Sequence, residues 1–369
     1  MPHLSGPQAT VLALWSFGMV LSHSCGLSSV SSSLALLLGV KENSVRQRIR
    51  EWSYAKEDKR GKGRCELDVS SSFGPLLQWV LSWWPAHEKR LALALDATNL
   101  GSVLVVLVIS VVYRGCAMPI AWRVLPCGQK GSWKGVWLEL FSHFQGVIPP
   151  DWLVIVMADR GLYAHWLLEA IQKCNWHPFL RINDRIFFRP KEGREFRALQ
   201  VAFHQPGCSW SGVVACFKTH PIEITLLVRW EEGFEEPWLI LTDLPVEQAL
   251  PCWYGLRSWI ECGFKQIKSA GWQWQHTRML DPERATRFWL AIAVATLWVL
   301  SIGGQADANL PASSFAALPE NHIARRRSPK KPYLRLLSCF RRGLMIILTA
   351  LIAQRPLPLG RFIPEPWPT

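Results

Sequence analysis

Three apolar, strand-like runs in close succession, followed by alternating helical and strand-like segments, limit the folds open to this chain. The runs cover residues 91–95, 103–113 and 118–125. The second is rich in β-branched residues, and an Arg-Gly pair at residues 114–115 indicates a turn before the third. We therefore expect these three segments to form an antiparallel meander.

After this meander the pattern changes. It predicts an amphipathic helix and a buried, parallel-type strand, then a second helix and a short strand, over residues 133–144, 152–158, 165–175 and 179–182. Three antiparallel strands followed by alternating helices and parallel strands is the element order of an RNase H-like core. We predict an α/β fold whose catalytic core combines residues 89–182 with a helical segment at residues 249–304.

Residues 1–88 predict a helical domain. An apolar helix over residues 31–39 ends in glycine, residues 41–44 offer a turn and an N-cap, and a second helix over residues 45–52 carries Arg46, Arg48 and Arg50. This order is typical of a helix-turn-helix, in which the three arginines would contact DNA. The alternative is a solvated helix face with a charged loop behind it.

Two further segments complete the organisation. Residues 183–248 predict a β-rich insertion with strands at 186–189, 210–218, 223–229 and 238–242. Residues 305–369 form a basic and apolar tail. It contains Arg325–Arg327, Lys330–Lys331, an apolar helix at 344–352 and a proline-rich end. A dimer surface, a DNA-contacting arm and a disordered end all fit that composition.

Three carboxylates on separate elements suggest the chemistry. Asp96 and Asp159 each follow an apolar strand, so they would meet at one edge of the sheet, and Glu261 would reach them from a helix. On an α-helix one face would combine Glu261 with a phenol and three cations, which are Tyr254, Arg257, Lys265 and Lys268. Such a site would hold two Mg²⁺ ions about 3.5–4 Å apart beside DNA phosphates.

Each carboxylate also has a purely structural explanation. Asp96 could be an N-cap, Asp159 a turn residue before a glycine, and Glu261 a member of a surface ion pair. Asp243 also ends an apolar strand, but we interpret it as a turn residue.

Charge and hydropathy constrain the partners. The formal net charge of +13 suggests a polyanion, with nucleic acid ahead of an anionic membrane surface, although a basic protein without such a partner is the alternative. The longest uncharged apolar run, residues 288–304, is shorter than the ~20 residues of a spanning helix, so we expect a buried helix and no membrane partner. Ten scattered cysteines suggest reduced thiols.

The motifs around these residues resemble those of the DDE transposases of the insertion-sequence-four family. The similar segments are Leu-Asp-Ala-Thr around Asp96, Ala-Asp-Arg-Gly around Asp159, and the family's Tyr-x2-Arg-x3-Glu-x6-Lys signature. Tyr254, Arg257, Glu261 and Lys268 match that signature without a gap. The resemblance covers roughly residues 91–300.

The resemblance implies an RNase H-like core, a β-strand insertion before the glutamate and a helical DNA-binding N-terminus. It implies cut-and-paste transposition by a bacterial, cytoplasmic enzyme that uses Mg²⁺, with Mn²⁺ as a substitute. The partners would be the double-stranded terminal inverted repeats, target DNA and a second copy of the chain. Some relatives form a DNA hairpin and hold a flipped base on a tryptophan. The candidates here are Trp210, Trp230, Trp238, Trp259 and Trp272.

Two other functions remain open at this level. One is a catalytically inactive protein derived from a transposable element that still binds DNA ends. The other is a membrane-associated basic protein that uses its apolar segments at residues 288–304 and 344–352.

Overall fold

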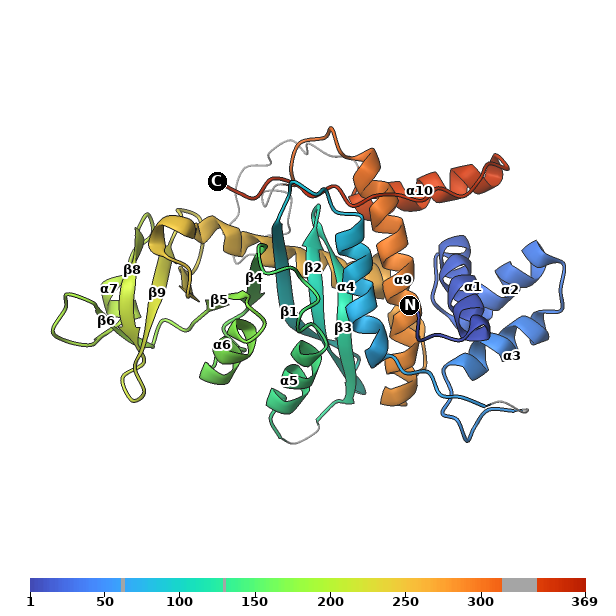
Figure 1. Cartoon of the computed structure of the whole chain (residues 1–369), viewed down its shortest axis with the longest axis horizontal. Coiled ribbons are helices and arrows are strands. Elements are labelled where there is room, and N and C mark those ends of the chain that lie inside the picture. The colour runs from blue at the N-terminus through green and yellow to red at the C-terminus, as the bar shows by residue number, and fades with distance from the viewer. Residues whose placement is uncertain (61–63, 129–130, 314–336) are drawn as a thin grey trace.

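The computed structural model describes residues 1–60, 64–128, 131–313 and 337–369. The basic clusters Arg325–Arg327 and Lys330–Lys331 lie outside the described residues. Figure 1 shows a central sheet with a helical lobe at one end and a strand-rich lobe at the other.

The core of the molecule has the predicted α/β architecture. Its strands are β1 (Arg90–Leu100), β2 (Leu104–Tyr113), β3 (Cys116–Pro126), β4 (Leu153–Ala158) and β5 (His177–Arg181). They lie in the order β3-β2-β1-β4-β5, with an antiparallel meander followed by parallel pairing of β1 with β4 and of β4 with β5. The RNase H-like prediction is confirmed by this strand order.

Helices cover both faces of the core sheet. The helices α5 (Lys134–Ser142) and α6 (His165–Gln172) contact each other on one side, and α8 (Trp259–Lys265) crosses the other (Figure 1). All ten positions of β2 are buried, because both of its faces are covered. Gly263 allows α8 to approach closely, since a Cβ there would lie 2.9 Å from the Ala117 side chain.

The predicted β-rich insertion continues the core sheet. Its elements are β6 (Phe187–Pro190), β7 (Arg197–Ala198), α7 (Leu199–Ala202), β8 (Ser209–Cys216), β9 (Ile222–Arg229) and β10 (Trp238–Thr242). Strand β10 pairs with β5 in the antiparallel direction, which extends the sheet to ten strands. The insertion is therefore tied to the core by backbone hydrogen bonds.

The N-terminal segment is helical, as predicted. It comprises α1 (Gly6–Ser22), α2 (Leu27–Leu38), α3 (Glu42–Trp52), a 3₁₀ turn η1 (Ser70–Ser72) and α4 (Phe73–Ser82). Gly39 ends α2 with a φ of 64°, a conformation that favours glycine. The sequence predicted that Ser44 caps the start of the second helix. This prediction is wrong, because α3 begins at Glu42 and its N-cap residue is Lys41. Helix α4 packs on β3, where Phe73 meets Trp122.

The buried helix predicted over residues 288–304 is part of α9 (Pro282–Ala306), which packs against β3, α1 and α10. It is long and apolar enough to cross a membrane, and 89% of its apolar window is buried inside the protein. The α1–α2 pair passes the same test only as a span bent by 95°. Burial of α9 inside the molecule matches the expectation of a core helix.

The segment that carries the glutamate motif is helical but is not one α-helix. A 3₁₀ helix η3 (Pro251–Ser258) leads into α8, and a π-helical turn η4 (Gln266–Ala270) follows it. Two short 3₁₀ turns, η2 (Val246–Gln248) and η5 (Trp274–His276), flank this segment. The sequence analysis placed these side chains on one face by assuming an α-helical rotation of about 100° per residue. That assumption is wrong for Tyr254, Arg257 and Lys268, because 3₁₀ and π turns have a different rotation per residue.

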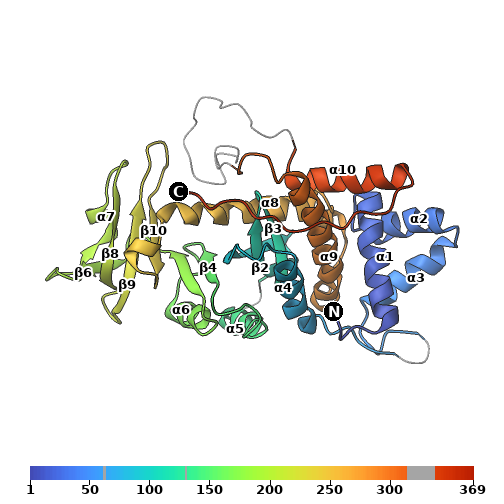
Figure 2. The same ribbon diagram turned by 45° about the horizontal axis from the view of Figure 1, so that its top comes forward.

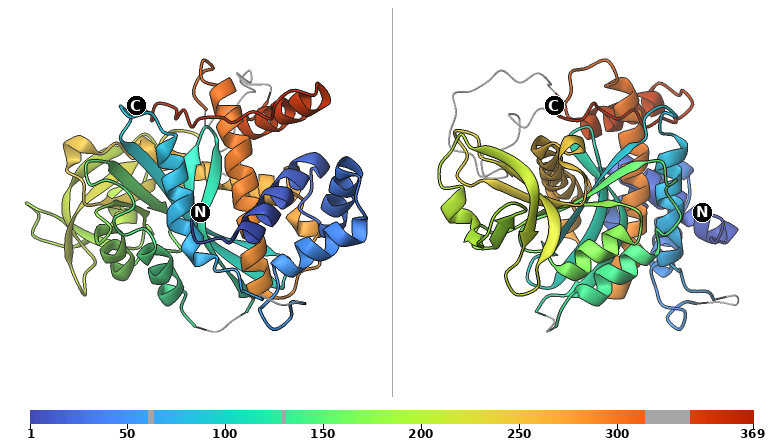
Figure 3. Two further views of the ribbon diagram at one scale, coloured as in Figure 1. Left: turned by 45° about the vertical axis from the view of Figure 1, so that its right-hand side comes forward. Right: turned by 60° about the vertical axis from the view of Figure 1, so that its left-hand side comes forward.

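The C-terminal segment packs onto the core. Helix α10 (Cys339–Ile352) crosses α9, and the chain then runs in extended form back along the sheet (Figure 2). Phe362 is fully buried among Trp79, Trp83 and Tyr113. Figure 3 shows this last stretch passing over the end of α9. The proline-rich end is thus docked on the core through Phe362, and the roles in dimerisation or DNA contact stay predictions.

The crossing of α9 and α10 depends on glycine. A Cβ on Gly343 would lie 2.0 Å from the Val299 carbonyl oxygen, and one on Gly303 would lie 2.0 Å from the Cys339 carbonyl oxygen. We expect Gly343→Ala to lower the free energy of unfolding by about 1–3 kcal/mol, because the two helices must separate. Urea denaturation would measure this. Gly135→Ala is the control, since a Cβ on Gly135 in α5 meets nothing within 4 Å and should leave stability unchanged or raise it.

Candidate functional site

A row of charged residues follows the parallel strands at one edge of the core. The last parallel pairs join Leu95 of β1 to Ala158 of β4, and Ala158 to Leu180 of β5. The next residues on these three strands are Asp96, Asp159 and Arg181. The register therefore sets the two aspartates side by side, with an arginine beyond them. The sequence suggested that the first strand ends at Asp96. Strand β1 instead continues to Leu100, and beyond Leu95 it pairs with β2 alone.

Arg257 lies between the two aspartates. Its Nη2 donates to Asp96 Oδ2 at 2.8 Å and lies 3.9 Å from Asp159 Oδ2. The Tyr254 hydroxyl donates to the Ala158 carbonyl at 3.4 Å and lies 3.5 Å from Asp159 Oδ1. Tyr254 and Arg257 are three residues apart in η3, so a 3₁₀ turn presents both side chains in the same direction.

Burial and charge set the protonation of the two aspartates differently. Burial raises the pKa of Asp96 to about 6 against the lowering effect of Arg257, and the charges of Glu261 and Asp159 raise it further. Burial also acts to raise the pKa of Asp159, but Arg257, the Arg160 amide and Arg181 together lower it. At Asp96, burial and the neighbouring carboxylates therefore outweigh the stabilising charge of Arg257, and the charged form is disfavoured relative to that of an exposed aspartate.

Glu261 lies on α8, close enough for its charge to act on both Asp96 and Lys268. Within the described ranges, no group of three or more His, Cys, Asp or Glu side chains is close enough to hold a metal ion. Asp96 and Asp159 both lie beside Arg257, and Glu261 acts on Asp96 through its charge. The donors fit a hard divalent cation in kind, since they are carboxylate oxygens.

The two lysines of the predicted face differ in their surroundings. Lys265 is exposed at the end of α8. Lys268 is half-buried in the π turn, where burial lowers its pKa and the charge of Glu261 opposes that shift. Lys268 is therefore electrostatically linked to Glu261.

Three functional candidates escaped the sequence reasoning. Glu236, in the loop between β9 and β10, accepts hydrogen bonds from Arg160 Nη1 at 2.8 and 2.9 Å and from Arg181 Nη2 at 2.8 Å. Arg181 Nη1 lies 3.9 Å from Asp159 Oδ1. The position of Arg181 after a parallel strand was a usable signal. Glu236 offered none, because its role depends on the pairing of β10 with β5.

The candidate tryptophans fall into distinct environments. Trp238 packs edge-on against Tyr254, with ring centroids 5.6 Å apart. Trp230 lines a cleft beside Arg160 and Arg181. Trp272 is fully buried, which removes it as a base-stacking platform. Trp210 packs within the insertion and Trp259 lines a small cavity at the C-terminal segment.

The rival carboxylate and the predicted DNA-reading arginines are also located. Asp243 accepts a hydrogen bond from Gln172 and pairs with His177 at 2.9 Å, consistent with a strand-end structural residue.

Helix α3 buries Val45, Ile49 and Trp52 and exposes its other face. Arg46, Arg48 and Arg50 are all exposed on this helix. Their contact with DNA stays a prediction.

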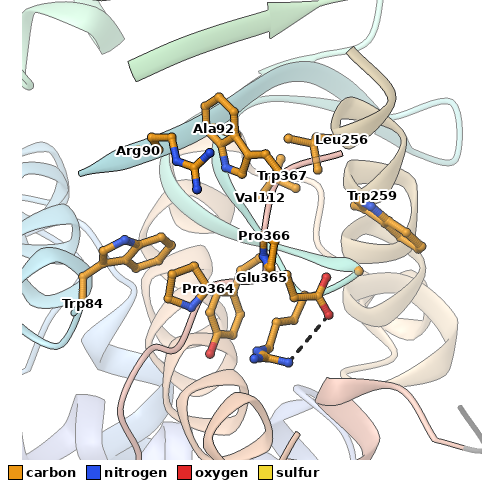
Figure 4. Close-up of a pocket in the computed structure, with 13 residues that line it drawn as sticks. Trp84, Arg90, Ala92, Val112, Leu256, Trp259, Pro364, Glu365, Pro366 and Trp367 are labelled. Carbon is orange, nitrogen blue, oxygen red and sulfur yellow. Dashed lines mark ion pairs between the residues drawn. The ribbon is translucent and has the colours of Figure 1, made fainter. Parts of the chain in front are cut away.

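The last residues of the chain support the helix that carries Tyr254 and Arg257. Trp367 packs edge-on against Trp253 with centroids 4.9 Å apart, and the Arg90 guanidinium lies 5.4 Å from its ring. Figure 4 shows Trp367 beside Arg90 and Leu256, with the Arg114–Glu365 ion pair below. The C-terminal segment thus braces η3 against β1.

Comparison with known proteins adds one family match. Residues 136–298 match the family model described as a transposase DDE domain, a range that includes Asp159 and Glu261 but begins after Asp96. No curated protein matches the chain. A solved structure entitled "Crystal structure of the Mos1 Strand Transfer Complex" is 14% identical with a TM-score of 0.19. The match covers 46% of this chain and 56% of that one, so the chain spans about half of its length.

The bracing of η3 can be tested at Trp367. We expect Trp367→Ala to lower the free energy of unfolding by about 3 kcal/mol, because it removes a large buried aromatic side chain from the Trp253 contact. Thermal and urea denaturation would measure the loss. Leu359→Ala is the matched control, since that side chain is 76% exposed in the same segment and should change stability by less than about 0.5 kcal/mol. Equal effects of the two substitutions would contradict the bracing role.

Proposed function

We propose that this protein is a metal-dependent DNA transposase that cleaves transposon ends and transfers the freed strand by cut-and-paste. The observation that carries the proposal is the convergence of Asp96, Asp159, Tyr254 and Arg257 at one edge of an RNase H-like sheet. The transposase DDE family match over residues 136–298 and the net charge of +13 support it.

Asp96, Asp159 and Glu261 are the residues that would hold Mg²⁺, with Mn²⁺ as a substitute. Two bound divalent ions would supply charge neutralisation at the phosphate and activation of the attacking oxygen. The fit rests on the hard carboxylate oxygen donors of Asp96 and Asp159, which approach the same Arg257 guanidinium.

The other residues of the site would bind and orient the DNA strand. Arg257 has a guanidinium aligned with both aspartates and could pair with a phosphate beside them. Tyr254 is buried and anchored to β4, so its hydroxyl would position a group next to Asp159. Lys268 would contribute a phosphate contact near Glu261, and exposed Lys265 a weaker one.

DNA recognition would use the N-terminal helices. The exposed arginines of α3 face away from the helical core, in the arrangement expected for helix-turn-helix contact with terminal inverted repeats. Target DNA and a second copy of the chain would complete the complex, in the bacterial cytoplasm. The alternative function, an inactive end-binding protein, shares this DNA surface and differs only in cleavage.

Loss of one metal-binding carboxylate separates the two functions. We expect Asp96→Asn to reduce Mg²⁺-dependent nicking of the element's own ends by about 10³-fold or more while end binding is retained. Nicking of labelled duplexes and gel-shift binding would be measured side by side. Asp243→Asn is the control, because Asp243 lies with His177 away from the aspartate pair. Full cleavage by Asp96→Asn would refute the assignment, and absence of cleavage by the wild type would favour the inactive protein.

Substitution of two exposed arginines tests the DNA-reading helix. Arg46→Ala combined with Arg48→Ala should weaken binding to the terminal repeats and lower the slope of log affinity against log salt by about 2, one for each lost phosphate contact. Lys173→Ala, an exposed cation at the end of α6, is the control. Unchanged affinity in the double variant would move the DNA-reading surface elsewhere.

A further inference from the structure

Glu236 occupies a position between two arginines that belong to the site edge. Arg160 directs Nη1 at both carboxylate oxygens of Glu236, and Arg181 directs Nη2 at one of them. Arg160 follows Asp159 in sequence, and Arg181 approaches Asp159 through Nη1. A carboxylate from the insertion loop is therefore held by cations that lie directly beside the candidate active site.

A cleft lies next to this ion-pair group. It has a volume of about 210 Å³ and is lined by Arg160, Arg181, Glu236, Glu235, Trp230 and His204 among others. The side chains of Arg160 and Glu236 are 50% and 39% exposed, whereas that of Arg181 is 15% exposed. A ligand that enters the cleft can thus reach both guanidinium groups.

We propose that Arg160 and Arg181 form a phosphate-binding site for the DNA strand, and that Glu236 fills this site in the absence of DNA. The inference rests on the proposed function and adds a site beyond the Tyr254–Lys268 face. A phosphodiester presents anionic oxygens to arginine in much the same way as a carboxylate does. DNA binding would then exchange the Glu236 carboxylate for a backbone phosphate.

Two features make this exchange feasible. Arg181 Nη2 also donates to the Pro237 carbonyl oxygen at 3.3 Å, so its side chain keeps an anchor when Glu236 leaves. The Arg160–Glu236 pair is half exposed, and an ion pair in that position is weak because water screens it. The cations are therefore oriented in advance, and one of the two ion pairs that hold Glu236 is weakened by water.

The test is duplex binding by Glu236→Gln, which keeps the side-chain size and removes the charge. We expect about 3- to 10-fold tighter binding at low salt, on both terminal-repeat and unrelated duplexes, because phosphate contacts carry no sequence information. Glu235→Gln is the matched control, since that neighbouring carboxylate lines the same cleft but is not the acceptor for Arg160 or Arg181. Thermal melting of each variant checks that the insertion stays folded.

A double variant separates competition from a structural effect. Arg160→Ala should weaken binding and lower the salt slope by about 1, and in the Arg160→Ala, Glu236→Gln double variant most of the gain should vanish. Equal affinities of Glu236→Gln and the wild type, with the wild type binding DNA, would overturn this site and leave the proposed function standing. A gain in Glu235→Gln as large as in Glu236→Gln would also overturn it. Failure of the wild type to bind any duplex would instead overturn both.

Discussion

The contact of Arg257 with Asp96 and Asp159 is the interaction on which the site depends. Two carboxylates placed side by side by strand register repel each other, and burial increases the cost of charging Asp96. One guanidinium within 4 Å of both offsets much of this repulsion. The surrounding structure keeps that guanidinium in place. Tyr254 anchors η3 to β4, and Trp367 braces η3 from behind.

The same electrostatic chain links the insertion to the core. It runs from Glu236 through Arg181 to Asp159, and from there through Arg257 to Asp96. Carboxylates and guanidinium groups alternate along it, so each charge has a neighbour of opposite sign. A change at the insertion end therefore alters the charge balance felt at the aspartates. The pairing of β10 with β5 keeps both ends in one sheet.

The hydrophobic pattern of the sequence predicted those strands and helices whose formation depends on neighbouring residues in the chain. The order of elements along the chain, the β-rich insertion and the positions of Asp96 and Asp159 after apolar runs followed from hydrophobic periodicity, because side chains alternate regularly along a strand. The mixed 3₁₀, α and π character of residues 251–270 did not follow, since it depends on packing against β3, where Gly263 meets Ala117. Arg257 was predicted to contact phosphate, but its pairing with both aspartates needed three-dimensional positions. The burial of Phe362 and the hydrogen bonds from Arg160 to Glu236 arise from contacts between segments far apart in the chain, so the sequence pattern did not predict them.

The site therefore combines fixed and exchangeable charges. Asp96, Asp159 and Arg181 directly follow the last residues of the parallel pairing, so the backbone hydrogen bonds of the sheet fix where each of them begins. Their counterions Arg257 and Glu236 come from a 3₁₀ helix and a loop, which lack that constraint. An arriving polyanion can replace a counterion more easily than it can move a strand. The sheet therefore fixes the positions of these charges, and the segments around it are free to adapt.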